Sequence, residues 1–275
     1  MDTTKAFIKN LINESASKNE LFKRNIVKEY LQVIVLDFIY SDPQLSRLLF
    51  YGGSCLAHCF GLPRLSEDLD FVDIKGEIEV SKLAKDLEIY FKKNTDLKLI
   101  STVQKFRIYL KFSILHELGL SDKSETDQLF LKVEVFTPPV FCKKFKVETI
   151  PLFKYNKSIL IRTFDFSTLM ATKIRAILHR KWEKTDKTGK TIAKVKGRDY
   201  FDLMWYLEKG VKPNMDCIEG IKSKIQLKES LLGIIKKVDP KSIQLDLESF
   251  IADEKFAGSL SREIKDILIR DINKL

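Results

Sequence analysis

The stretch from Tyr51 to Val72, which reads YGGSCLAHCFGLPRLSEDLDFV, constrains the fold more than any other part of this chain. Gly52 and Gly53 follow an apolar run and precede an apolar segment, which gives this part the form of a strand, a tight turn and the start of a helix. Glycines at such a turn let the backbone approach a ligand closely and direct N–H groups at it. The turn therefore predicts a backbone that binds phosphate.

The second half of the stretch alternates like a β-strand. Asp68 and Asp70 are separated by one residue, so both carboxylates point to one face, while Leu69 and Phe71 point to the core. Neighbouring carboxylates repel each other, and a divalent cation relieves that repulsion. Mg²⁺ prefers hard oxygen ligands and substrate phosphates. The turn and the carboxylate pair together predict a metal–nucleotide site; the alternative is a solvated strand end.

This combination resembles the nucleotidyltransferase superfamily that includes DNA polymerase beta, in which a G-[GS]-S turn precedes D-x-D on a strand. The longer form, GGSCLAHCFGLPRLSEDLDF, is similar to the AbiEii/MenT nucleotidyltransferase toxins of bacterial abortive-infection toxin–antitoxin systems. The resemblance spans about residues 48–207. It implies an α+β (α/β) fold, with a polymerase-beta-like sheet, flanking helices and a C-terminal helical domain.

Two-metal phosphoryl transfer usually needs a third carboxylate. Glu134 offers one in the strand-like run 131–136, where Val133 and Val135 face the other way. In the superfamily this carboxylate lies on a strand beside the D-x-D strand. The resemblance therefore implies that Glu134 is a metal ligand or the general base for the incoming hydroxyl. The alternative is a strand-edge glutamate paired with Lys132, which shares its face.

Several residues near the turn are expected to bind the nucleotide. Ser54 and the backbone N–H groups around Gly53 would hold the triphosphate. Ser66 resembles the serine of the toxin motif and would bond a phosphate oxygen; alternatively, it caps the entry to the strand. Arg64 is either another anion contact or a partner of Glu67.

Two motifs in the second half strengthen the resemblance. Residues 165–176, DFSTLMATKIRA, resemble the toxin family's L-x-A-x-K-x-x-A helix, and Lys173 falls at its lysine. Residues 197–203, GRDYFDL, resemble the family's R-D-x-x-D-L. The resemblance implies that Lys173 neutralises charge on the triphosphate as pyrophosphate leaves. It also implies that Asp199 is a functional acidic residue that positions Lys173 or the nucleotide.

Plainer interpretations of these acidic residues stay open. Asp199 and Asp202 share one helix face. Asp199 could be a helix N-terminal charge favoured by the macrodipole, and Asp202 could be a salt-bridge partner. The cationic residues that follow the motif lysine, Arg175, His179 and Arg180, are expected to be RNA or surface contacts.

Composition narrows the class of partner. The chain has 275 residues, enough for one large domain or two smaller ones, and 44% apolar with 31% charged residues excludes wholesale disorder. The net charge of +10 favours a polyanionic partner such as nucleic acid, although a lysine-rich surface also serves solubility. The lysine-rich segment 183–196 is expected to be a mobile loop, either solvated or a basic finger on RNA.

The cysteines and apolar runs indicate a cytoplasmic protein without membrane association. The cysteines form no C-x-x-C pair and are expected to be unpaired thiols, as in a reducing compartment: Cys55, Cys59, Cys142 and Cys217. Cys55, His58 and Cys59 have ordinary core spacing on a helix, so no zinc site is expected. The N-terminus has no h-region, and the most apolar run, 31–40, is too short to span a bilayer.

Periodicity predicts that the chain changes near residue 165 from a mixture of strands and helices to helices. Before it, helices are expected over 1–16, 19–40 and 79–93, with a short helix starting at Ser54, and strands over 47–51, 68–74, 97–103, 105–115, 129–136, 146–151 and 158–162. After it, helices are expected over 167–181, 198–208, 216–225, 228–237, 243–250 and 261–272. We therefore expect a nucleotidyltransferase domain over 1–165 and a helical domain over 166–275.

These features predict a nucleotidyltransferase that uses one or two Mg²⁺ ions held by Asp68, Asp70 and Glu134. An acceptor hydroxyl would attack the α-phosphate of an NTP and release pyrophosphate. The resemblance implies a toxin that adds nucleotides to the 3′ end of tRNA and blocks translation, with a cognate antitoxin encoded nearby. Alternatives are transfer of AMP onto a protein hydroxyl, or a nucleotide-binding regulator without turnover.

Overall fold

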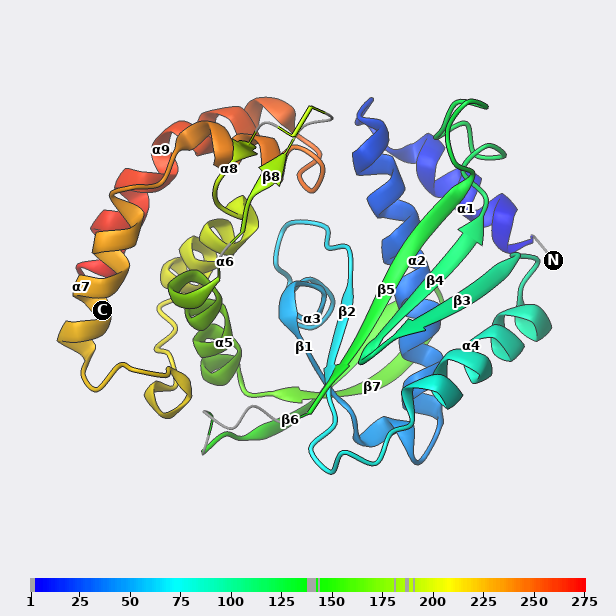
Figure 1. Cartoon of the computed structure of the whole chain (residues 1–275), viewed down its shortest axis with the longest axis horizontal. Helices are drawn as coiled ribbons and strands as arrows, with labels where there is room; N and C mark the ends of the chain where they lie inside the picture. The colour runs from blue at the N-terminus through cyan, green and yellow to red at the C-terminus, as the bar shows by residue number, and fades with distance from the viewer. Residues whose placement is uncertain (1–2, 138–141, 143, 181, 186–187, 190) are drawn as a thin grey trace. The chain divides into compact units, whose positions relative to one another are not determined.

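The computed structural model describes residues 3–137, 142, 144–180, 182–185, 188–189 and 191–275. The chain folds into two compact units (Figure 1). The first comprises residues 1–138 and 147–163, and the second comprises residues 139–146 and 164–275. Division into independently folding domains near residue 165 stays a prediction.

The first unit packs helices on a mixed sheet that has seven strands among the described residues. Its helices are α1 (Thr4–Glu14), α2 (Glu20–Ser41), the short 3₁₀ helix η1 (Leu45–Arg47), α3 (Gly52–Phe60) and α4 (Val80–Asn94). Its strands are β1 (Leu49–Tyr51), β2 (Leu69–Val72), β3 (Leu99–Gln104), β4 (Arg107–Ser113), β5 (Gln128–Phe136), β6 (Val147–Lys154) and β7 (Lys157–Phe164).

The strand order across this sheet is β3-β4-β5-β2-β1-β7-β6. Strand β4 runs antiparallel to both β3 and β5. Strand β2 is parallel to β5 and antiparallel to β1, and β1 is parallel to β7. The two strands expected to carry carboxylates, β2 and β5, are therefore direct neighbours near the middle of the sheet.

One face of the β3–β5 region is the core of the first unit. Here the cross-strand pairs Ile108–Val133 and Leu110–Leu131 are fully buried. Helix α4 contacts β3 and β4, and α2 contacts β5 and lies behind β4 and β5 in the view of Figure 1. Because side chains alternate along a strand, the intervening residues point to the opposite face. That opposite face carries the acidic residues of the candidate site.

The second unit is mainly helical. Its helices are α5 (Phe166–His179), α6 (Gly197–Glu208), the 3₁₀ helix η2 (Met215–Cys217), α7 (Lys224–Ile235), α8 (Pro240–Leu247) and α9 (Glu254–Ile272). Helix α6 contacts α5, α8 and α9. At its first residue, Gly197, a Cβ atom would lie 2.7 Å from the carbonyl oxygen of Ile243, so only glycine allows α6 to start this close to α8. In the described residues, no helix is both long and apolar enough to cross a membrane.

Most helices and strands expected from periodicity are confirmed within a few residues, but the helix expected over 216–225 is wrong. The amide side chain of Asn214 instead caps a single 3₁₀ turn, and Gly220 then adopts a φ of +79°. The hydroxyl of Ser223 accepts from the backbone N–H of Gln226 and starts α7 there. Capping side chains and a left-handed glycine decided this segment against its apolar periodicity.

Two other expectations are corrected. The segment 183–196 does not form a plain loop, because β8 (Lys184–Thr185) and β9 (Thr191–Ala193) pair in it, although residues 186–187 and 190 lie outside the described residues. Strand β9 contacts α8, and Ala193 is buried.

The expectation of unpaired thiols is wrong for Cys142 and Cys217, which form a disulfide across 75 residues of sequence. Cys55 and Cys59 are free thiols.

Candidate active site

The glycine turn between β1 and α3 packs directly against one of the predicted metal ligands. Tyr51, the last residue of β1, is the register partner of Asp70 on β2. Gly52 has a φ of +81°, and a Cβ atom there would overlap the Asp70 carboxylate. Both the backbone conformation and the space therefore require glycine at this position.

The next residue places two polar groups over the start of α3. A Cβ atom on Gly53 would lie 2.8 Å from Nη2 of Arg64 and 2.9 Å from Oγ of Ser66. Arg64 is only 6% exposed, so a guanidinium is held in the interior near a helix N-terminus. The helix dipole at that end favours anions and opposes a cation. Nη1 of Arg64 donates to the carbonyl of Leu65, and a contact of Arg64 with a bound anion stays a prediction.

Ser54 has a structural contact that the sequence did not indicate. Its hydroxyl is buried and donates to the backbone carbonyl of Asp68. This bond ties the first turn of α3 to the entry of β2. In the structure the hydroxyl is thus committed to the backbone, so binding of phosphate by this side chain stays a prediction.

Strand register brings the predicted carboxylates to one sheet face. Asp70 on β2 is the parallel partner of Glu134 on β5, and Asp68 precedes β2 by one residue. As predicted, Leu69 and Phe71 are fully buried on the opposite face. Two strands far apart in the sequence therefore deliver three acidic side chains to the same region.

Two cations already contact these carboxylates. Lys132 Nζ lies 3.0 Å from Asp68 Oδ2 and 3.2 Å from Glu134 Oε1. Arg107 Nε donates to Glu134 Oε1 at 2.5 Å. Burial lowers the pKa of Lys132, but Asp68 and Glu134 outweigh it and raise this pKa above its usual value. The pairing of Glu134 with Lys132, foreseen as the plainer alternative, is present, and Arg107 adds to it.

The chemistry of this donor set fits a divalent cation, with one qualification from geometry. The carboxylates of Asp68 and Asp70 are hard oxygen donors beside a turn suited to phosphate. Among the described residues, however, no group of three or more His, Cys, Asp or Glu side chains is arranged to hold a metal ion. The ammonium of Lys132 lies between Asp68 and Glu134, where a metal ion bound by both carboxylates would lie. Asp68 and Asp70 would therefore hold the ion, and Glu134 would join only after Lys132 moves.

A second ionic cluster lies within the second unit. Lys173 on α5 contacts Asp199 Oδ1 at 2.9 Å and Asp202 Oδ2 at 2.8 Å, both on α6. Arg180 contacts the other oxygen of Asp199 at 2.6 Å. Burial raises the pKa of Asp199, but Lys173 and Arg180 outweigh it and lower this pKa to about 2. Arg180 is exposed, as expected from the sequence, and its ion pair with Asp199 also makes it part of this cluster.

Lys196, just before α6, is a candidate functional residue that the sequence did not indicate. Burial and the nearby charge of Arg198 lower the pKa of Lys196 to about 8, while Asp199 opposes that change. Perturbed lysines are found both in functional sites and in structural ion-pair networks. No local pattern in the sequence indicates that this lysine, unlike its neighbours in a lysine-rich segment, is largely enclosed.

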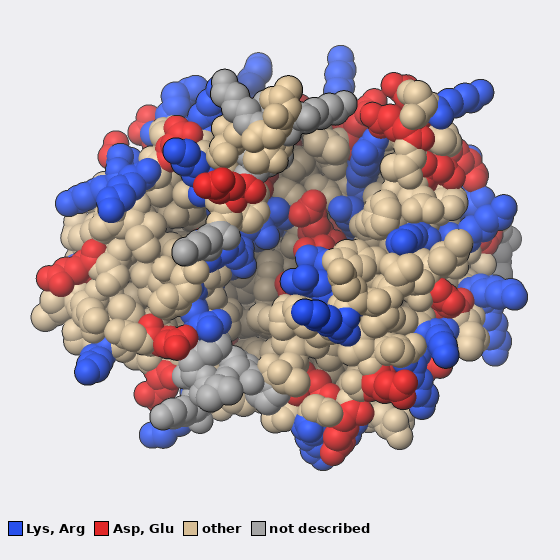
Figure 2. All heavy atoms as spheres, in the orientation of Figure 1, with Lys and Arg blue, Asp and Glu red and all other residues tan. Residues whose placement is uncertain are grey.

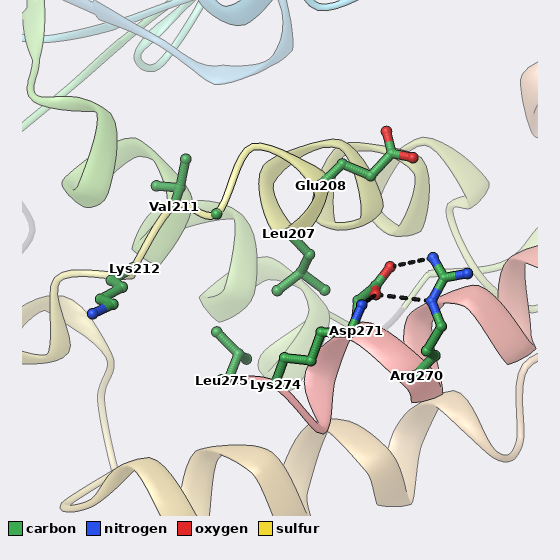
Figure 3. Close-up of a pocket in the computed structure, with 9 residues that line it drawn as sticks. Leu207, Glu208, Val211, Lys212, Arg270, Asp271, Lys274 and Leu275 are labelled. Atoms are coloured by element: carbon green, nitrogen blue, oxygen red, sulfur yellow. Dashed lines mark hydrogen bonds and ion pairs between the residues drawn. The ribbon is translucent and has the colours of Figure 1, made fainter.

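A separate cavity of about 440 Å³ lies at the other end of α6 (Figure 3). It is lined by Leu207 and Glu208 of α6 and by residues around the end of α9. There Arg270 and Lys274 hold Asp271, and their hydrogen bonds lower the pKa of this carboxyl to about 2. From Asp199 to Glu208 is about 13 Å along the helix, so this cavity is distinct from the Lys173 cluster.

Comparisons with known proteins agree with these features. A profile described as "Nucleotidyl transferase AbiEii toxin, Type IV TA system" matches residues 36–270. The fold is similar to that of MenT4, a nucleotidyltransferase toxin from Mycobacterium tuberculosis, with a TM-score of 0.56 and 13% identity over all of this chain and 91% of that one. JHP933 from Helicobacter pylori aligns with a TM-score of 0.45 and 16% identity, over 91% of this chain and 94% of that one. No curated protein matches this sequence significantly.

The profile match covers the glycine turn, the carboxylate strands and both ionic clusters, and it spans most of the chain. The mixed sheet with flanking helices is the fold of nucleotidyltransferase toxins. The protein therefore belongs to the AbiEii family of nucleotidyltransferase toxins of type IV toxin–antitoxin systems.

Proposed function

We propose that this protein transfers a nucleotide from an NTP to the 3′-terminal hydroxyl of a tRNA and thereby blocks translation in the cytoplasm. The hydroxyl oxygen attacks the α-phosphorus and loses its proton to water, the bond to the bridging oxygen breaks, and pyrophosphate leaves. The observation that carries the proposal is the convergence of Asp68, Asp70 and Glu134 on one sheet face beside the Gly52 turn.

The nucleotide-binding roles follow from contacts around α3. The close approach of Asp70 to Gly52 leaves no side chain between the turn and the carboxylates. Backbone N–H groups at Gly53 and Ser54, with Arg64 and Ser66 beside them, would hold the triphosphate. Asp68 and Asp70 would bind Mg²⁺, which neutralises phosphate charge and lowers the barrier to phosphoryl transfer.

Glu134 fits a positioning role better than that of a general base. It is 7% exposed and accepts from Arg107 while contacting Lys132. Its Oε1 atom is already engaged by Arg107 Nε and Lys132 Nζ, so these two cations compete with an incoming hydroxyl for that oxygen. We propose that Glu134 holds Lys132 and Arg107 beside the site and becomes a metal ligand only when Lys132 leaves.

Lys173 and Asp199 belong to the proposal through their motifs and their ion pair. Asp199 and Asp202, three residues apart on α6, both contact the Lys173 ammonium, which suits a lysine that must be presented in one orientation. We propose that Lys173 binds the nucleotide and that Asp199 is its positioning residue.

The acceptor and the partner are supported by family membership and charge. Type IV toxins act with an antitoxin, which we expect to be encoded beside this chain. A net charge of +10 suits an RNA acceptor. In Figure 2, however, Lys and Arg side chains are interspersed with Asp and Glu over the face drawn, so net charge alone singles out no RNA-binding surface there.

The test is a transfer assay with purified protein, Mg²⁺, each labelled NTP in turn, and either total tRNA or total cell protein. Asp68→Ala serves as the inactive control. Label at the 3′ end of tRNA supports the proposal and names the nucleotide. Label on protein would instead assign an AMP-adding enzyme. Nucleotide binding without any transfer would assign a regulator and overturn the proposal.

A further inference from the structure

The sheet face that carries Glu134 continues outward over β5, β4 and β3, away from the glycine turn. Cross-strand register defines its rows, each row made of residues that lie side by side on the three strands. From the carboxylates outward the rows are Glu134, Arg107 and Gln104; then Lys132, Tyr109 and Thr102; then Phe130, Lys111 and Ile100. These nine residues are called the outer sheet face.

Apolar side chains on the outer sheet face are exposed, whereas those on the opposite face of the same strands are buried. Phe130 is 42% exposed and Ile100 is 61% exposed, whereas Leu129 and Leu131, the neighbours of Phe130 along β5, are at most 3% exposed. The Nζ atom of Lys111 lies 5.9 Å from the centroid of the Phe130 ring. An aromatic ring with a cation beside it therefore stands on an open strand surface.

The charge of the outer sheet face is positive. Lys111, Lys132 and Arg107 are its cations, and Glu134 is its one acidic member, already paired with Lys132 and Arg107. Single-stranded nucleic acids bind proteins by stacking bases on exposed aromatic rings while cations contact the backbone phosphates. The RRM fold uses aromatic residues on an open sheet face in this way.

We propose that the outer sheet face binds the unpaired 3′ end of the RNA acceptor, with bases stacked on Phe130 and Tyr109 and a phosphate at Lys111. Phe130 lies four residues from Glu134 on β5, about 13 Å along the strand. Tyr109 lies between them in the row of Lys132. An RNA strand laid over these rows leads to the carboxylates. The proposal rests on the proposed function and adds the surface and the single-stranded form of the acceptor.

The test measures the affinity of the full chain for a short 5′-fluorescein-labelled single-stranded oligoribonucleotide by fluorescence anisotropy, without NTP. Phe130→Ala should weaken binding about tenfold, the effect of losing one stacked base. Phe130→Tyr keeps the ring and should bind about as well as the wild type. Lys111→Ala should reduce the slope of log affinity against log salt by about one.

Matched controls come from the same unit. Phe153 on β6 is 75% exposed, so Phe153→Ala removes an exposed ring of the same kind and should leave RNA affinity unchanged. Lys85→Ala removes an exposed lysine on α4, which covers the opposite face of the sheet. A duplex oligonucleotide with blunt ends should bind more weakly than the single strand, because its bases are not free to stack on the protein.

The outcomes separate this proposal from the proposed function. If the wild type labels tRNA but Phe130→Ala binds and transfers like Phe153→Ala, the outer sheet face is not the acceptor surface and the enzyme assignment stands. If Phe130→Ala changes only the oligomeric state, the face contacts protein and the proposal is wrong. If the wild type neither binds the oligoribonucleotide nor labels any RNA, both proposals fail.

Discussion

Each unit of this protein holds an ionic cluster built around residues that the sequence singled out, and the two clusters differ in how their charges are satisfied. In the second unit Asp202 is fully buried, and Lys173 is held between it and Asp199 at 2.8 and 2.9 Å. In the first unit the Asp68 side chain is 31% exposed and shares only the ammonium of Lys132 with Glu134. Both clusters contain cations, but the first keeps a part-exposed carboxylate at Asp68, whereas Asp199 and Asp202 of the second are buried.

The comparison indicates different roles for similar residue types. A buried ion pair that loses one partner leaves an uncompensated charge in the interior, so the second cluster should contribute strongly to stability. The part-buried carboxylates of Asp68 and Asp70 contribute less to folding, and we propose that they bind a metal. We therefore expect mutations in the first cluster to lower activity with little loss of stability, and mutations in the second cluster to lower stability as well as activity, since Lys173 is proposed to bind the nucleotide.

The largest effect is expected at the carboxylates of the first unit. Asp70→Asn keeps the shape of the side chain beside Gly52 but removes the charge, and it should lower the rate of nucleotide transfer about 10³-fold. Thermal unfolding should stay close to that of the wild type. Asp86→Asn on α4 is the control. Transfer at the wild-type rate in Asp70→Asn would remove this residue from the metal site.

The next effect is on stability. Asp202→Ala leaves Lys173 with Asp199, which Arg180 also contacts, and should lower the free energy of unfolding by about 3 kcal/mol. Urea unfolding of the full chain measures it, with Asp86→Asn again as the control. A variant that unfolds like the wild type yet has lost transfer would place Asp202 in the chemistry instead.

A pH dependence should follow from Asp199. Its pKa is about 2 in the folded chain, against 3.8 ordinarily, so the unfolded chain binds more protons between these values. The stability that Asp199 contributes is complete above about pH 4 and is lost as the pH falls toward 2, by about 2 kcal/mol. Because other carboxyls titrate in the same range, the wild type is compared with Asp199→Asn by urea unfolding at pH 5 and pH 3. A constant difference between the two would contradict the expectation.

The smallest effect concerns the ammonium that lies between two carboxylates. Lys132→Ala removes the cation that contacts both Asp68 and Glu134, and should raise the affinity for Mn²⁺ about tenfold, since the ammonium and the metal compete for the same oxygens. Isothermal titration calorimetry or electron paramagnetic resonance of Mn²⁺ measures this binding and does not require activity. Lys85→Ala should not change it. Equal affinities would show that Lys132 does not compete with the ion.

Much of the fold could be predicted from local patterns. The alternation at Leu69 and Phe71, the helical stripe of residues 19–40 and the double glycine each encode structure through the periodicity or freedom of a few residues. Segment 216–225 was mispredicted because its apolar periodicity lost to the capping by Asn214 and Ser223. The Cys142–Cys217 disulfide joins positions 75 residues apart that no spacing pattern connects.

The sequence by itself determined the family, the glycine turn and the positions of the acidic residues, because these depend on residue types at short spacing. Only the tertiary structure decided how those residues are paired. Arg107 reaches Glu134 across β4 and β5, and Lys173 meets Asp199 from a different helix. The enclosure of Arg64 and Lys196 likewise depends on elements distant in sequence. Pairing and burial arise from strand register and helix packing, which join residues that local sequence patterns cannot relate.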